Sequence, residues 1–237
     1  MAASRYPRGH VALERALSKL GLASRREAQQ LARDGAVTVN GRVVNDPLAA
    51  VRPERDQIVV GERIGARPAW RTVAFHKPRG CVTTRRDPQG RPTVFDLLGR
   101  VADGLVAVGR LDLATTGLLL LTTDTQLAER LTNPERGVMR RYVVTVRGEV
   151  KDEDCRRLEQ GVEGMRAASV AVRKRSRRET HLIVELTEGK NREIRRLFAA
   201  VGHEVTRLLR VAYGPIDLGT LQPGGWRDVS AAEFSRP

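Results

Sequence analysis

Asp112 is the residue of this sequence best placed to do covalent chemistry. It lies in the stretch GRLDLATTGLLLLTTD, after one apolar run that ends at Val108 and before another at 118–121. Such runs are typical of buried strands, and Gly109 and Gly117 bracket a short loop that would hold Asp112 in place. A carboxylate is ionised at neutral pH and can act as a nucleophile without a metal ion. An Asp in a strand-connecting loop is also a common turn former, so the stretch alone leaves both roles open.

A second candidate segment, EGKNREIRRLFAAVG at 188–202, joins a polar turn to an amphipathic helix. Gly189 would let backbone amides and Lys190 approach a phosphate where the helix starts. The apolar residues share one helical face. The opposite face is basic, with Arg192, Arg195 and Arg196. The pattern fits a phosphate-binding surface or a merely solvated helix face.

Two further features could contact a nucleic acid. Tyr142 begins the apolar strand of RRYVVTVRG, in a chain with only 4% aromatic residues. A base stacked on an exposed tyrosine gains about 1–3 kcal/mol, although most strand tyrosines simply pack. The RKRSRR run at 173–178 could follow an RNA backbone, or it could be a solvated loop or sheet edge.

The charge of the chain indicates a polyanionic partner. Among 237 residues, 42 Lys and Arg oppose 28 Asp and Glu, which gives a formal net charge of +14. The 41% hydrophobic content argues for a folded globular protein. A membrane partner is disfavoured because the sequence has no long apolar run, and the N-terminus does not resemble a signal peptide. We therefore expect a cytoplasmic protein that binds nucleic acid.

The sequence contains no pattern for a metal or an organic cofactor. Cys81 and Cys155 are far apart and outside any CxxC pattern, so we expect two reduced structural thiols. The four histidines are scattered, and no HExxH motif is present. The GxxxxGK phosphate loop, the GxGxxG turn and the GxSxG elbow are also missing. We expect the protein to use neither a metal nor a cofactor.

The N-terminal third is predicted to be a small domain at 10–67, preceded by a mobile basic tail at 1–9. Apolar spacing predicts a helix near 13–20, and Ser24 with Glu27 forms a capping box for a second helix. A hairpin follows, with Asn40-Gly41 as a type I′ turn, and Ile58 to Val60 closes the domain. Arg25 and Arg26 lie in the first turn of the second helix, where an anionic ligand would offset the helix dipole, although solvated side chains would also tolerate that position.

The rest of the chain, 71–237, is predicted to be an α+β domain with a mixed, mainly antiparallel sheet and flanking helices. A short linker at 65–70 precedes it. Strands are expected near 72–75, 105–108, 118–121, 142–146 and 182–186. Helices are expected at about 124–131 and at 152–160. The elements do not follow the regular strand and helix alternation of a doubly wound fold.

Two resemblances to known families cover nearly the whole chain. The stretch SKLGLASRREAQQLARDGAVTVNGRVV, at 18–44, resembles an S4 domain, a small RNA-binding module. Five later segments, in this order, resemble the RsuA/RluB-type ribosomal RNA pseudouridine synthases. They are KPRG (77–80), GRPTVFDLL (90–98), GRLD with TTGLLLLTTD (109–124), RRY (140–142) and EGKNREIRRLFAAVG (188–202). One departure is Arg140, where that family commonly has Lys, so a phosphate contact there is left open.

The resemblance implies specific roles for individual residues. Asp112 would be the catalytic aspartate, Tyr142 the active-site tyrosine, and Arg195 the arginine that pairs with the aspartate. Leu208 would be the apolar contact beneath the target base. With the basic and polar positions noted above, the residues expected to contact RNA are Arg25, Arg26, Lys77, Arg110, Thr116, Lys190, Asn191, Arg192 and Leu208.

The expected function is isomerisation of a specific uridine in ribosomal RNA to pseudouridine, with base flipping. Asp112 would attack C1′ of the sugar or C6 of the base, or promote a glycal route. Resemblance favours the RluB branch, which acts on the 23S RNA of the large subunit, and 16S RNA is the alternative substrate. A non-catalytic RNA-binding or ribosome-assembly protein is the alternative from another class. We expect a monomer that binds ribosomal RNA or a pre-ribosomal particle.

Overall fold

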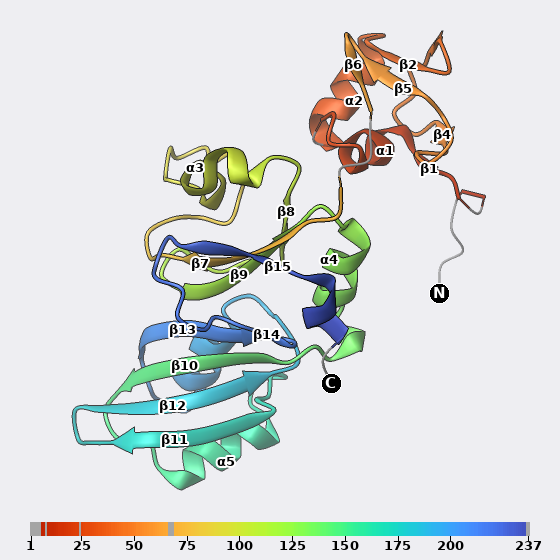
Figure 1. The fold of residues 1–237 in the computed structure, drawn as a ribbon. Helices are drawn as coiled ribbons and strands as arrows, with labels where there is room; N and C mark the ends of the chain where they lie inside the picture. Colours follow the sequence, from red (N-terminus) through yellow and green to blue (C-terminus); the bar gives the residue numbers. More distant parts are fainter. Residues whose placement is uncertain (1–5, 8, 24, 66–68, 236–237) are drawn as a thin grey trace. The chain divides into compact units, whose positions relative to one another are not determined.

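The computed structural model describes residues 6–7, 9–23, 25–65 and 69–235. The chain divides into two compact units, Met1–Ala69 and Trp70–Pro237, which are described separately below (Figure 1). The proposed cap at Ser24 and most of the expected tail at 1–9 lie outside the described residues, as does the middle of the expected linker.

The first unit packs two helices against short strands. α1 (Leu13–Lys19) and α2 (Arg25–Arg33) form the expected helix pair. β2 (Val37–Val39), β3 (Arg42–Val43), β5 (Ile58–Val60) and β6 (Arg63–Ile64) form one antiparallel sheet, and β1 (Val11–Ala12) pairs with β4 (Ala50–Val51). The predicted turn is confirmed, because Asn40 and Gly41 both have a positive φ, of 51° and 78°.

The second unit is built on one large sheet with the strand order β11-β12-β10-β13-β9-β7-β15; β8 also pairs with β9, and β14 with β13. The strands are β7 (Thr72–Lys77), β8 (Val106–Val108), β9 (Thr116–Thr122), β10 (Arg140–Arg147), β11 (Ser169–Arg175), β12 (Glu179–Leu186), β13 (Val205–Tyr213), β14 (Ile216–Asp217) and β15 (Trp226–Val229). Among the described strands the pairs are antiparallel, except for the parallel pair β13 and β9. The predicted α+β class with a mixed, mainly antiparallel sheet is therefore confirmed.

Helices cover this sheet on both sides (Figure 1). α5 (Asp152–Gln160) and α6 (Glu193–Ala200) bury apolar residues against β10, β12 and β13. α3 (Val94–Leu98) packs on one face of β7 and β9, and α4 (Thr125–Thr132) on the other. Leu118 to Leu121 are consequently all buried, which explains why this strand is a continuous apolar run. The remaining helical turns are the 3₁₀ segments Gly99–Ala102, Pro134–Arg136 and Ala231–Ser235.

Candidate active site

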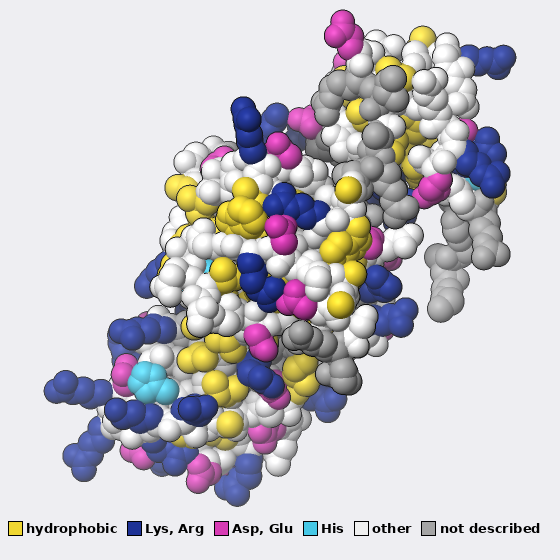
Figure 2. Space-filling view, in the orientation of Figure 1, with side chains coloured by type: hydrophobic (Ala, Val, Ile, Leu, Met, Phe, Trp, Pro, Cys, Tyr) yellow, Lys and Arg dark blue, Asp and Glu magenta, His cyan; other side chains and the backbone are white. Residues whose placement is uncertain are grey.

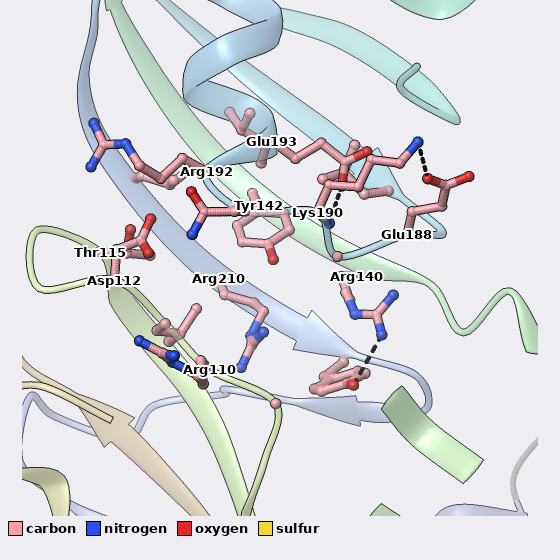
Figure 3. A pocket seen from close by; sticks show the side chains of 18 of the residues that line it. Arg110, Asp112, Thr115, Arg140, Tyr142, Glu188, Lys190, Arg192, Glu193 and Arg210 are labelled. Atoms are coloured by element: carbon pink, nitrogen blue, oxygen red, sulfur yellow. Dashed lines mark hydrogen bonds and ion pairs between the residues drawn. The ribbon is translucent and has the colours of Figure 1, made fainter. Parts of the chain in front are cut away.

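A large pocket of the second unit opens where the two halves of the sheet meet at β9 and β13. It has a volume of about 620 Å³ and is lined by the loop after β8, by β10, by the turn before α6 and by β13 (Figure 3). Seven of the residues expected to contact substrate line it, namely Arg110, Asp112, Tyr142, Lys190, Asn191, Arg192 and Leu208. Segments that are far apart in the sequence therefore converge on one cavity.

Asp112 lies in the loop that joins β8 to β9, and its side chain is half-buried in the pocket wall. Its backbone carbonyl accepts a hydrogen bond from the Thr115 amide at 3.0 Å. The Thr83 hydroxyl donates to the carbonyl of Leu111 at 3.0 Å, and Gly80 donates to the carbonyl of Leu113 at 2.9 Å. These bonds fix the loop on both sides of Asp112, as the sequence predicted for a carboxylate held in one place.

Tyr142 and Leu208 form an apolar part of the pocket. Tyr142 begins the core of β10 and pairs with Arg210 of β13, while Leu208 pairs with Val144. Because side chains alternate across a strand, all four point to the same face of the sheet. Tyr142 and Leu208 are 8% and 7% exposed. In the view of Figure 3 the tyrosine ring lies between Asp112 and the ion pair of Lys190 with Glu188.

Arg195 lies near Asp112 but differs from the expectation in one respect. Within the described residues, no hydrogen bond or ion pair joins the two side chains. Instead, Nη1 of Arg195 donates to the carbonyl of Val205 at 2.7 Å, and its buried Nε finds no partner in the described part of the chain. Burial lowers the pKa of Arg195, and the charge of Arg192 lowers it further, whereas the charge of Asp112 raises it. The direct pair is therefore replaced by an electrostatic interaction at longer range.

The structure gives Lys77 and Thr116 different places from those expected. Lys77 is 0% exposed, and its ammonium group donates to the carbonyls of Pro78 and Thr115 at 3.1 and 2.9 Å. Burial lowers the pKa of Lys77, while the charges of Cys81 and Asp112 oppose that shift. A direct RNA contact by Lys77 is thus corrected to a cation buried near Asp112. The Thr116 hydroxyl donates to the carbonyl of Leu208 at 3.3 Å. Thr116 is not among the residues that line the pocket, whereas its neighbour Thr115 is.

The turn before α6 forms the opposite wall of the pocket. The helix expected after this turn is α6, which begins at Glu193. Arg192, just before it, has a left-handed backbone conformation. Lys190 is exposed, and its ammonium group pairs with Glu188 at 2.6 Å and donates to the carbonyl of Gly164 at 2.8 Å. Arg192 and Asn191 are exposed at the rim, where they are accessible to a ligand.

Arg210, Arg140 and Tyr213 also line the pocket, and none of them was among the residues expected to contact RNA. Arg210 is 3% exposed and donates from Nε to the carbonyl of Leu118 at 2.7 Å. Its buried Nη2 has no hydrogen-bond partner among the residues that the structure describes. Its guanidinium and that of Arg140 each lie 4.8 Å from the ring centre of Tyr213. Arg140 also donates to the carbonyls of Val138, Thr187 and Leu131. Arg140 is therefore buried, and both of its Nη atoms donate to groups within the protein.

The remaining expected contacts lie elsewhere. Arg25 and Arg26 belong to the first unit, where both are exposed in the first turn of α2. Among the described residues, no group of three His, Cys, Asp or Glu could hold a metal ion. Within the same described ranges, no helix has the length and apolar character needed to span a membrane.

Comparison with known proteins finds two families in this chain. The family described as RNA pseudouridylate synthase matches residues 71–200, and the S4 domain matches residues 13–57. "Ribosomal large subunit pseudouridine synthase B" of Escherichia coli (strain K12) is 40% identical over 232 residues, covering 93% of this chain and 80% of the relative. The protein of the same name from Vibrio cholerae serotype O1 is 42% identical, covering 94% of this chain and 73% of the relative. A solved structure of a pseudouridylate synthase has a TM-score of 0.69 at 26% identity, covering 95% of this chain and 98% of the other.

Proposed function

The chain belongs to the RNA pseudouridylate synthase family and carries an S4 domain, and from this we propose that it converts a uridine of large-subunit ribosomal RNA to pseudouridine. The names of the relatives from Escherichia coli and Vibrio cholerae support the large subunit as the substrate. The net charge of +14 suits a polyanionic substrate. We further propose that the protein acts in the cytoplasm as a monomer, on ribosomal RNA or on a pre-ribosomal particle.

The reaction is an isomerisation within one nucleotide. The bond from N1 of uracil to C1′ of the ribose breaks, the base turns, and a bond forms from C5 to the same C1′. The proton on C5 is lost and N1 gains one, so atoms and charges balance without an oxidant or a cofactor. The chemistry needs one nucleophile or base beside the nucleotide.

We assign that role to Asp112, and one observation carries the assignment. Asp112 contributes its carboxylate to the same pocket wall as the apolar side chains of Tyr142 and Leu208. Asp112 in turn raises the pKa of both Lys77 and Arg195, so these two cations lie close enough to interact favourably with its charge. An ionised carboxylate can attack the nucleotide and later accept the proton from C5.

A uridine inside an RNA helix cannot reach this carboxylate, so the nucleotide must leave its stack. In our proposal the flipped uracil lies against Tyr142 and Leu208, which exclude water from one side of the base. Arg110, Asn191 and Arg192 at the rim would hold the adjoining backbone. Stacking on the tyrosine ring contributes about 1–3 kcal/mol toward the cost of flipping.

The proposal is tested with transcribed ribosomal RNA that carries tritium at C5 of uridine. Purified protein should release tritium from large-subunit RNA and should leave small-subunit RNA unchanged. Release from small-subunit RNA alone would move the substrate to the other subunit. Tight binding to both RNAs without release from either would support a non-catalytic RNA-binding protein instead.

A further inference from the structure

Four of the six residues that line another cavity of the same unit are arginines. It has a volume of about 260 Å³ and lies where β10 ends and β13 begins. Its lining residues are Arg79, Arg147, Arg178, Glu179, Thr206 and Arg207. We call this cavity the arginine groove. None of its residues lines the pocket that contains Asp112.

The positive charge of the arginine groove is only partly neutralised within the protein. Arg147 pairs with Glu204 at 3.0 Å, and Glu179 contacts His181 at 2.9 Å. The side chains of the other three arginines form no ion pair or hydrogen bond among the described residues. They are Arg79, Arg178 and Arg207. Guanidinium groups held together without counter-charges repel one another, and a bound polyanion removes that repulsion.

The surroundings of the groove are also basic. Arg178 directly precedes β12, in the turn that follows β11. The final residues of β11, Arg173 to Arg175, are exposed at the edge of the sheet, and Arg175 pairs with Asp152. Figure 2 shows Lys and Arg side chains gathered at this end of the sheet, over the turn between β11 and β12. The RKRSRR run therefore lies partly at the sheet edge and partly in the turn after it, and its last residue, Arg178, lines the groove.

Arg79 connects the groove to the catalytic pocket electrostatically. It lies two residues after the buried Lys77. The amide of the next residue, Gly80, donates to the carbonyl of Leu113, which follows Asp112 in the chain. The charge of Arg79 lowers the pKa of Arg195, whereas the charge of Asp112 raises it. Strand alternation places Arg207 on the opposite face of β13 from Leu208. The groove is thus near the pocket without being part of it.

We propose that the arginine groove binds backbone phosphates of the RNA that flanks the flipped uridine. This inference rests on the proposed function. Arginine forks match phosphate oxygens in geometry and stay charged when desolvated, so an RNA strand is the polyanion that this groove fits. Contacts to phosphates position a substrate without reading its sequence, so the groove would set affinity and leave the chemical step unchanged.

The test compares two double variants that each remove two positive charges. Arg178→Gln with Arg207→Gln removes two unpaired groove arginines. Arg156→Gln with Arg157→Gln removes two exposed arginines of α5, which lie outside both cavities. RNA affinity is measured against salt concentration with a fluorescent single-stranded RNA of roughly 20 nucleotides. Tritium release is measured with transcribed large-subunit RNA.

We expect the groove variant to lower the slope of log affinity against log salt by about 1.4, because each phosphate contact on single-stranded RNA contributes about 0.7. KM should rise while kcat at saturating RNA equals that of the wild type, and the α5 variant should resemble the wild type. Equal slopes for groove variant and wild type would overturn the inference, as would equal losses in both variants. Weaker binding of the groove variant to phosphatidylglycerol vesicles, with unchanged RNA binding, would assign the groove to a lipid surface. If the wild type released no tritium, the proposed function itself would fail, whatever the slopes.

Discussion

At the level of single residues, the wall of the pocket depends on a buried group of two arginines and one tyrosine. The Tyr213 hydroxyl donates to the carbonyl of Leu131 at 2.8 Å and accepts from Arg140 at 3.1 Å. The ring lies against the guanidinium groups of Arg140 and Arg210. Buried arginines are tolerated only when carbonyl oxygens and aromatic rings replace water around them. These partners come from distant segments, so residue spacing alone gives no sign of them.

Replacing Tyr213 by Phe tests this group. The ring remains, but Leu131 loses a donor and Arg140 loses an acceptor, so we expect the free energy of unfolding to fall by about 1–3 kcal/mol. Urea denaturation measures the change. The matched control is Tyr142→Phe, because no protein partner of the Tyr142 hydroxyl is recorded among the described residues. An equal loss of stability in both variants would contradict the account.

Glu193 provides a prediction on pH. Burial raises the pKa of this carboxyl above its ordinary value of 4.5. Between 4.5 and the raised pKa, the folded protein binds more protons than the unfolded chain, so stability falls as pH rises through that window. Glu193→Gln removes the titration and keeps an acceptor for the Lys190 amide. We expect the variant to gain stability over the wild type as pH rises above 4.5, by urea denaturation at a series of pH values. A constant difference at all pH values would exclude a raised pKa.

At the level of elements, the parallel contact of β9 with β13 joins the two halves of the sheet, and β13 lines the pocket beside it. Gly117 occurs at this contact, with a φ of +106°. A Cβ atom there would lie 2.3 Å from the carbonyl oxygen of Arg210 and 2.6 Å from its nitrogen. No side chain fits against backbone atoms at that distance.

Gly117→Ala should therefore separate the two strands. We expect a loss of at least about 3 kcal/mol in unfolding free energy, from the strained backbone together with the clash. The control is Gly137→Ala, whose φ is +57° and whose Cβ would meet no atom within 4 Å. That change should cost about 1 kcal/mol. Similar melting temperatures for the two variants would show that β9 and β13 can move apart at little cost.

The sequence was informative about elements whose pattern is unbroken. Leu118 to Leu121 and the alternation in β12 both predicted strands that the structure contains. β13 was not predicted as a strand, because the buried Arg210 interrupts its apolar alternation. α3 is short and depends on the capping box of Thr93 with Asp96, a signal that was present but unused. Charged residues at buried positions thus limit what periodicity can predict.

At the level of the whole molecule, we propose that RNA binding is divided between the S4 unit and the catalytic unit. Replacing Arg25 and Arg26 together by Gln removes two exposed cations from the first turn of α2. We expect weaker RNA binding and a higher KM, with kcat unchanged, because these residues lie outside the unit that contains Asp112. Steady-state tritium release measures both constants. A fall in kcat with an unchanged KM would contradict this division.

The difference between local sequence motifs and contacts between distant segments explains which parts of the site were predictable. Asp112 and Tyr142 occur in motifs that carry the family resemblance, which also implied a role for Leu208, and the fold brings all three into one pocket. Burial decides the roles of Lys77 and Arg195, because each donates to backbone carbonyls contributed by another segment. A local motif contains no information about such partners. The arginine groove is likewise assembled from four separate segments.

The most direct test of the central claim is the replacement of Asp112 by Asn, with Asp124→Asn as a control. Asp124 caps α4, and Asn is an equally good cap, so that variant should keep wild-type activity. We predict that Asp112→Asn lowers single-turnover tritium release by at least about a thousandfold, because the nucleophile is lost, while RNA affinity stays within about twofold of the wild type. Turnover near the wild-type rate in Asp112→Asn would show that this carboxylate does not carry the reaction.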